Sequence, residues 1–130
     1  NQLGGTLPVL DLPLDKPRPA HQAHRAEGVN FHLDEPLLEQ LEELGQKQGA
    51  TLFMVMLGLY ALMLYRYSRQ LDILVSVPVS ARNQLEIAQL MGPFINRLVC
   101  RFALKPQRSF ASWLQEVKKT LLEALDNQDT

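Results

Sequence analysis

Residues 52–65 read LFMVMLGLYALMLY, an uncharged and largely apolar run of fourteen residues. A membrane-spanning helix needs about 20 such residues, so this run is too short to cross a bilayer. Thr51, a typical helix N-cap, precedes the run. The apolar residues of the run are not confined to one helical face. The run therefore predicts a helix, ending near Tyr67, that is buried on nearly all sides and needs neighbours on each of them.

The chain before this helix predicts a strand and then an amphipathic helix. Residues 29–33 alternate apolar and polar side chains, which indicates a short half-buried strand. Asp34 can cap a following helix that has Pro36 in its first turn and ends at Gly49. One face of that helix carries four leucines, Leu37, Leu38, Leu41 and Leu44.

The chain after the apolar run predicts two strands. Residues 73–79 are rich in β-branched side chains without helical gaps, as expected of a strand covered on both faces, and Pro78 ends the strand or places it at an edge. Residues 94–104 alternate, with Asn96 as the one polar residue on an apolar face and Arg97 on the opposite face.

A last helix completes the predicted layout. Ser109 caps it, and its apolar stripe consists of Phe110, Trp113, Leu114, Val117, Leu121 and Leu125. Three strands separated by helices indicate an α/β fold, in the form of an α+β sandwich with a mixed sheet flanked by helices. Because three strands are a small sheet for a helix buried on all sides, we expect either an oligomer or a piece of a larger domain.

Composition excludes several classes of protein. The chain has 130 residues, of which 46% are hydrophobic and 21% charged, as in soluble globular domains. Its net charge of −1 favours neither nucleic acid nor an anionic membrane as a partner. Cys100 is the only cysteine, which excludes an internal disulfide and a multi-cysteine metal cage. With no secretory signal in the first residues, we expect a cytoplasmic protein.

The charges are nevertheless polarised along the chain. Residues 34–48 hold five acidic residues and one lysine, whereas residues 66–119 hold nine basic and three acidic residues. Such runs are commonly solvated faces, and the alternative is that the basic part meets an acidic partner.

The residues indicate no catalytic or metal centre. His21 and His24 lie three residues apart, but in a proline-rich stretch without an accompanying cysteine or carboxylate pair, so we predict no metal site. His32 belongs to the polar face of the first predicted strand, and Cys100 to the apolar face of the last. The sequence contains no GxSxG motif and no phosphate-binding glycine loop.

Five phrases nevertheless occur in a characteristic order. They are LPLDKPRP (residues 12–19), GATLF (49–53), DILVSVPVSAR (72–82), MGPFINRLVCR (91–101) and NQD (127–129). In this order and spacing they resemble the phrases LPxDxPRP, GATLF, DIxVGxPVxGR, (I/V)GxFVNTxxxR and (H/N)QDxPFE of the condensation domain of non-ribosomal peptide synthetases. The resemblance covers essentially the whole chain.

The resemblance implies where this chain lies in such a domain. The family builds its domain from two lobes, each similar to chloramphenicol acetyltransferase, and the chain resembles the first part of the C-terminal lobe. We therefore expect residues 1–28 to be an extended proline-rich connecting segment and residues 29–130 a partial C-terminal lobe. The family's HHxxxDG signature belongs to the other lobe and is absent from these residues, so we assign no catalytic residue and expect the chain alone to be inactive.

The family's activity is amide formation between two carrier-bound groups. The amine of an acceptor aminoacyl thioester attacks a donor acyl thioester, and both arrive on the phosphopantetheine arms of peptidyl carrier protein domains. The resemblance thus implies no bound cofactor and two kinds of partner, the carrier domains and the N-terminal lobe. Arg82 matches the family arginine that pairs with the aspartate of HHxxxDG and braces the catalytic loop, a role suited to a bidentate guanidinium.

Asn96 matches the asparagine of FVNT and is a candidate to line the substrate tunnel, with a plain strand-end role as the alternative. Ser76 and Ala81 replace the usual glycines, Pro93 replaces a residue that is often aromatic, and Arg97 replaces the usual threonine. Strand alternation places Arg97 opposite Asn96, so we expect it to point away from the tunnel.

Two other functions stay open on the sequence. An epimerisation or cyclisation domain shares the two-lobe design and differs in the upstream motif. A non-catalytic module could instead use the basic part of the chain to dock acidic carrier domains, with Arg66, Arg69 and Arg108 as candidate contacts.

Overall fold

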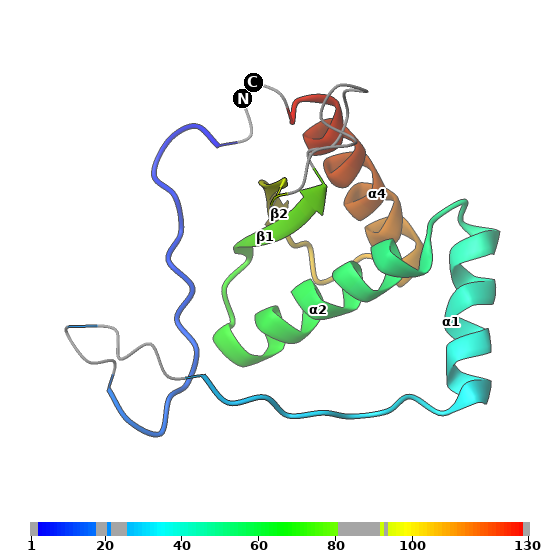
Figure 1. The fold of residues 1–130 in the computed structure, drawn as a ribbon, viewed down its shortest axis with the longest axis horizontal. Coiled ribbons are helices and arrows are strands. Elements are labelled where there is room, and N and C mark those ends of the chain that lie inside the picture. The colour runs from blue at the N-terminus through cyan, green and yellow to red at the C-terminus, as the bar shows by residue number, and fades with distance from the viewer. Residues whose placement is uncertain (1–2, 18–20, 22–25, 81–91, 93, 129–130) are drawn as a thin grey trace.

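The computed structural model describes residues 3–17, 21, 26–80, 92 and 94–128. The elements follow in the order helix α1 (Glu35–Lys47), helix α2 (Leu52–Ser68), strand β1 (Asp72–Ser80), strand β2 (Ile95–Ala103) and helix α4 (Phe110–Asp126). Both α2 and α4 pack on the sheet and on each other, while α1 lies beside the start of α2 (Figure 1). The described part therefore has the helices and sheet of the predicted fold class.

Each helix begins at the residue that its sequence predicts. Asp34, Thr51 and Ser109 have extended backbone conformations, and their side chains accept hydrogen bonds from the main-chain N–H groups three residues further on. These bonds satisfy donors that a helix leaves free in its first turn. Local sequence thus determines where the three helices start.

The sheet of the described residues has two antiparallel strands rather than the expected mixed set. Ile73 pairs with Phe102 and Val75 with Cys100, and all four side chains face the helices. The opposite face of β1 is only half covered, because Ser76 and Pro78 are exposed, which corrects the prediction of burial on both faces. The strand continues past Pro78 to Ser80, since a strand at a sheet edge tolerates the missing N–H.

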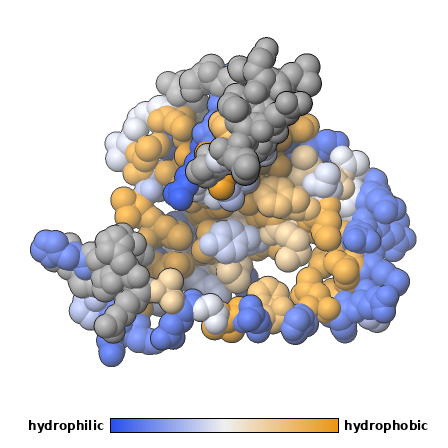
Figure 2. All heavy atoms as spheres, in the orientation of Figure 1, coloured by the Kyte–Doolittle hydropathy of each residue, from blue (hydrophilic) through white to orange (hydrophobic). Residues whose placement is uncertain are grey.

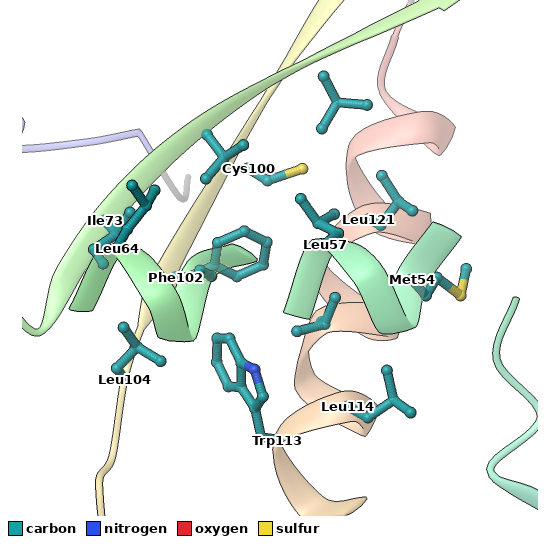
Figure 3. Packing of buried hydrophobic residues seen from close by; sticks show 14 of the residues in the cluster. Met54, Leu57, Leu64, Ile73, Cys100, Phe102, Leu104, Trp113, Leu114 and Leu121 are labelled. Atoms are coloured by element: carbon teal, nitrogen blue, oxygen red, sulfur yellow. The ribbon is translucent and has the colours of Figure 1, made fainter. Parts of the chain in front are cut away.

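The core lies between the sheet, α2 and α4. The rings of Phe102 and Trp113 meet edge to face with centroids 5.5 Å apart, in the middle of this core (Figure 3). The predicted stripe of α4 is confirmed, because its buried residues are Trp113, Leu114, Val117 and Leu121. A T-shaped aromatic pair adds about 0.5–1.5 kcal/mol to the free energy gained from burial alone.

The N-terminal residues are held to this core by a side-chain amide. Gln70 donates from Nε2 to the Val9 carbonyl at 2.9 Å, and its Oε1 accepts the Asp11 N–H at 2.7 Å. Leu10 and Leu12, on the same stretch, pack against the core. The side-chain amide of Gln70 thus pairs with the main chain of residues 9 and 11 as a neighbouring strand would, and this stretch lies along the surface. The end of the predicted connecting segment at residue 28 stays a prediction.

The strand predicted at residues 29–33 does not form. These residues are extended but pair with no strand in the described part, and Val29 and Phe31 are 90% and 76% exposed. Figure 1 shows the segment running along the far side of α2 from the sheet, toward α1. Alternating side chains indicate two environments but do not supply a neighbouring strand, which β pairing requires.

Helix α2 is less enclosed than predicted. Met54, Val55, Leu57, Gly58, Ala61 and Leu64 are buried, whereas Phe53, Leu59, Tyr60, Met63 and Tyr67 are exposed. In Figure 2, hydrophobic side chains occupy much of the middle of the face in view, and hydrophilic side chains lie on the outer side of α1. The expected shortage of neighbours is therefore visible as an apolar face of α2 that the described residues leave open.

No single helix in the described part is long and apolar enough to cross a membrane. Helices α1 and α2 together have the length and composition of a membrane-spanning segment, but the chain bends by 103° between them.

Candidate functional site

The candidate site residue Asn96 lies at the start of β2, on the face that points to the helices. Leu98, Cys100 and Phe102 follow it on that face and are buried, while Asn96 itself is half-buried. Arg97 points the other way and is exposed, as its strand position predicts.

Both polar groups of the Asn96 amide have main-chain partners. Its Oδ1 accepts the N–H of Arg97 at 2.8 Å, and its Nδ2 donates to the carbonyl of Gln128, just past the end of α4, at 2.7 Å. This contact joins two of the phrases quoted above, MGPFINRLVCR and NQD. Sequence reasoning identified the residue but not this partner, and the role of Asn96 in lining a tunnel stays a prediction.

Arg82, the residue expected to brace the catalytic loop, lies outside the described residues. The strand that precedes it in sequence, β1, ends at Ser80, which pairs with Ile95, and Val79 pairs with Asn96. The end of β1 therefore lies at the same end of the sheet as Asn96, beside the C-terminal part of α4 (Figure 1).

A groove with a volume of about 930 Å³ lies along the last turns of α2. Arg66 and Arg69, two of the predicted partner contacts, line it together with apolar and aromatic side chains, namely Leu59, Leu62, Met63, Tyr65, Tyr67 and Pro106. Both arginines are exposed, and neither forms an ion pair with another described residue. The groove thus combines an open apolar lining with two cations that form no ion pair within the described part of the chain.

The third predicted contact, Arg108, lines an adjoining pocket of about 190 Å³ that shares Leu62, Tyr65 and Pro106 with the groove. Arg108 forms an ion pair with Glu116 of α4, so part of its charge is already compensated. The structure therefore brings the three arginines to one surface, with Arg66 and Arg69 the more available to an acidic partner.

A fourth arginine, Arg101, was not singled out from the sequence. Its Nε and Nη2 donate to both carboxylate oxygens of Asp72 at 2.7–3.2 Å, and its Nη1 donates to the Gly4 carbonyl at 3.0 Å. The hydrogen bonds from Arg101 hold the pKa of Asp72 below its usual value. The sequence places opposite charges, Asp72 and Arg101, on two predicted strands. Only the register of the two strands shows that these side chains meet.

The remaining candidates do not gather into a centre. His21 and His32 are exposed, and His24 lies outside the described residues. Among the described residues no group of three or more histidine, cysteine or acidic side chains could hold a metal ion. Cys100 is buried, and loss of hydration raises the pKa of its thiol.

Comparison with known protein families identifies the family to which the chain belongs. The Condensation domain family matches residues 1–130, so the chain belongs to that family. It is similar to bacitracin synthase 3 of Bacillus licheniformis, with 38% identity over 131 aligned positions, and to tyrocidine synthase 3 of Brevibacillus parabrevis, with 38% identity over 129. Each match covers 99% of this chain and 2% of the relative, so the chain spans a small part of the length of these proteins.

Solved structures agree with the family. The fold matches that of holo-AB3403, a four-domain nonribosomal peptide synthetase bound to AMP and glycine, with a TM-score of 0.91 and 25% identity over 94% of this chain and 9% of that chain. The first condensation domain of the CDA synthetase matches with a TM-score of 0.64 and 30% identity, over 68% of this chain and 21% of that one. The predicted family and fold class are confirmed.

Proposed function

We propose that this chain is part of a condensation domain that joins a donor acyl group to an acceptor amine, forming an amide. The observation that carries the proposal is the family match over residues 1–130, which includes all five phrases. Both groups arrive as thioesters on phosphopantetheine arms of peptidyl carrier protein domains, so the arms are substrates. The acceptor nitrogen forms the new bond to the donor carbonyl carbon, and the donor thiol leaves on its carrier.

The chain's own contribution to this reaction is support for the site. HHxxxDG is absent from these residues, so the catalytic histidine is supplied by the N-terminal lobe of the complete domain and the chain by itself is inactive. Arg82 holds the aspartate of that motif across the lobes, because a guanidinium can bind a carboxylate through two parallel hydrogen bonds. A cytoplasmic location belongs to the same proposal, and a single buried thiol without a disulfide is compatible with it.

The test of this role is the condensation rate of the full-length protein that contains the chain. Loss of a charge-assisted hydrogen bond costs about 1.5–3 kcal/mol, so Arg82→Ala should lower the rate roughly 10–100-fold. Arg97→Ala removes an exposed arginine from the outer face of β2 and is the matched control. An unchanged rate in Arg82→Ala would exclude the bracing role.

The groove at the end of α2 supports a second part of the proposal, the docking of an acidic carrier domain. Its apolar lining can accept side chains from a partner helix, while Arg66 and Arg69 pair with carboxylates at the rim. Four of the fourteen acidic residues lie on α1, beside the opposite end of α2, and in the described part of the chain no ion pair joins Arg66 or Arg69 to a carboxylate. We therefore assign Arg66 and Arg69 as the main contacts and Arg108 as a secondary one.

A further inference from the structure

The amide of Asn96 connects two elements that are 32 residues apart in sequence. Its carbonyl oxygen is fixed by the N–H of the next residue, Arg97, which leaves the NH₂ group directed at the Gln128 carbonyl. Gln128 directly follows the C-cap Asn127, so Asn96 donates to the first carbonyl beyond the end of α4.

Two further hydrogen bonds at this end of α4 join residues of the helix end to one another. Asn127 donates from Nδ2 to the Glu123 carbonyl at 2.7 Å, and the N–H of Gln128 donates to the Leu125 carbonyl at 3.2 Å. These bonds fix the turn itself but do not attach it to the sheet. The bond from Asn96 links this turn to β2.

The position of this contact in the sheet gives it a second consequence. Asn96 pairs with Val79, one residue before the end of β1 at Ser80. Arg82, whose bracing role is proposed above, follows Ser80 by two residues in the sequence. A contact at this end of the sheet therefore relates three parts of the chain to one another, namely the end of β1, the start of β2 and the residues after α4.

We infer that Asn96 is a positioning residue, which holds the residues after α4 against the end of the sheet from which the chain continues to Arg82. This assignment differs from a tunnel-lining role, because the amide acts through the main chain of Gln128. The effect of the Asn96–Gln128 contact on turnover rests on the proposed condensation activity, whereas the existence of the contact does not depend on that proposal.

The experiment uses the full-length protein with two variants at this position. Asn96→Asp keeps an oxygen for the Arg97 N–H but loses the donor, and Asn96→Ser keeps an acceptor on a side chain too short to reach Gln128. Gln128→Ala is the matched control, because the acceptor is a main-chain carbonyl that this change retains. Amide hydrogen exchange of residues 125–128, the melting temperature, and kcat and KM for the carrier substrates are measured.

We expect amide exchange at the end of α4 to rise about tenfold in both Asn96 variants, since one lost hydrogen bond changes a local opening equilibrium by about that factor. The kcat should fall while the KM stays unchanged, the melting temperature should fall slightly because the folded state loses one hydrogen bond, and Gln128→Ala should behave as wild type. Unchanged amide exchange in both variants would show that the hydrogen bond from Asn96 to Gln128 does not hold the end of α4. Increased exchange with unchanged kcat would overturn the positioning role. If the wild type forms no amide, the proposed function fails, and the exchange result still decides the contact.

Discussion

The indole N–H of Trp113 on α4 donates to the main-chain carbonyl of Gly58 on α2 at 3.1 Å. Gly58 lies close to α4 at this point. A Cβ there would lie 3.3 Å from Trp113 Nε1 and 3.4 Å from Val117 Cγ2, both on buried residues that have little room to move. The distance between α2 and α4 therefore depends on a glycine in the middle of an otherwise apolar helix.

Gly58→Ala should destabilise the chain. Overpacking a core costs about 1–3 kcal/mol, and the better helix propensity of alanine returns about 1 kcal/mol, so we expect a net loss of about 1 kcal/mol. The free energy of unfolding in urea measures it. Gly28→Ala is the control, since a Cβ at Gly28 would contact nothing within 4 Å. Equal stability of the two variants would contradict the close approach.

The ion pair of Arg101 with Asp72 should make stability depend on pH. Because the pKa of Asp72 is lowered in the folded chain, its contribution is present above the unfolded value of about 3.9 and is lost as the pH falls through the folded pKa. Asp72→Asn should therefore be less stable than wild type near neutral pH, and the two should converge in acid. Thermal unfolding at several pH values measures this, and a difference that persists undiminished in acid would contradict it.

The open apolar face of α2 should cause the 130-residue chain to associate in solution. Leu59 and Met63 lie on this face, are 37% and 46% exposed, and line the groove. Large exposed apolar patches favour association, so the double variant Leu59→Gln, Met63→Gln should be monomeric at concentrations where the wild type is not. Sedimentation velocity over a concentration series measures the difference. A monomeric wild type over the whole series would show that the face needs no cover.

Reversal of charge at the groove should weaken binding of an acidic carrier domain. Arg66→Glu with Arg69→Glu places like charges opposite the partner, and we expect more than about a tenfold rise in Kd at low salt, with a smaller difference at high salt. Fluorescence anisotropy with a labelled carrier domain measures the Kd. Arg97→Glu has the same type of charge change on an exposed residue outside the groove and is the control. Equal affinity of the groove variant and this control would exclude the groove as the docking surface.

Features that depend on near neighbours in sequence could be predicted. Asp34, Thr51 and Ser109 cap the helices as expected, because a cap bonds to a group three residues away. The inward positions of β2 follow from alternation, and the family follows from phrases whose order is visible without a structure.

Features that depend on distant partners could not be predicted. Residues 29–33 have the side-chain pattern of a strand, but a pattern does not provide the second strand. The exposure of one face of α2 was missed because leucine, methionine and tyrosine occur on all its sides. The contact of Asn96 with Gln128 depends on how α4 returns to the sheet, which neither phrase specifies by itself.

The central claim is that this chain forms part of an amide-forming domain, and the mass of the acceptor carrier tests it most directly. The full-length protein would be supplied with a donor acyl group and an acceptor aminoacyl group on their carrier domains, and the acceptor carrier analysed by intact mass spectrometry. We predict that its mass increases by that of the donor acyl group, in a product resistant to hydroxylamine at the new amide, and more slowly in Arg82→Ala. An acceptor carrier that keeps its original mass, although both carriers are fully loaded, would contradict the account.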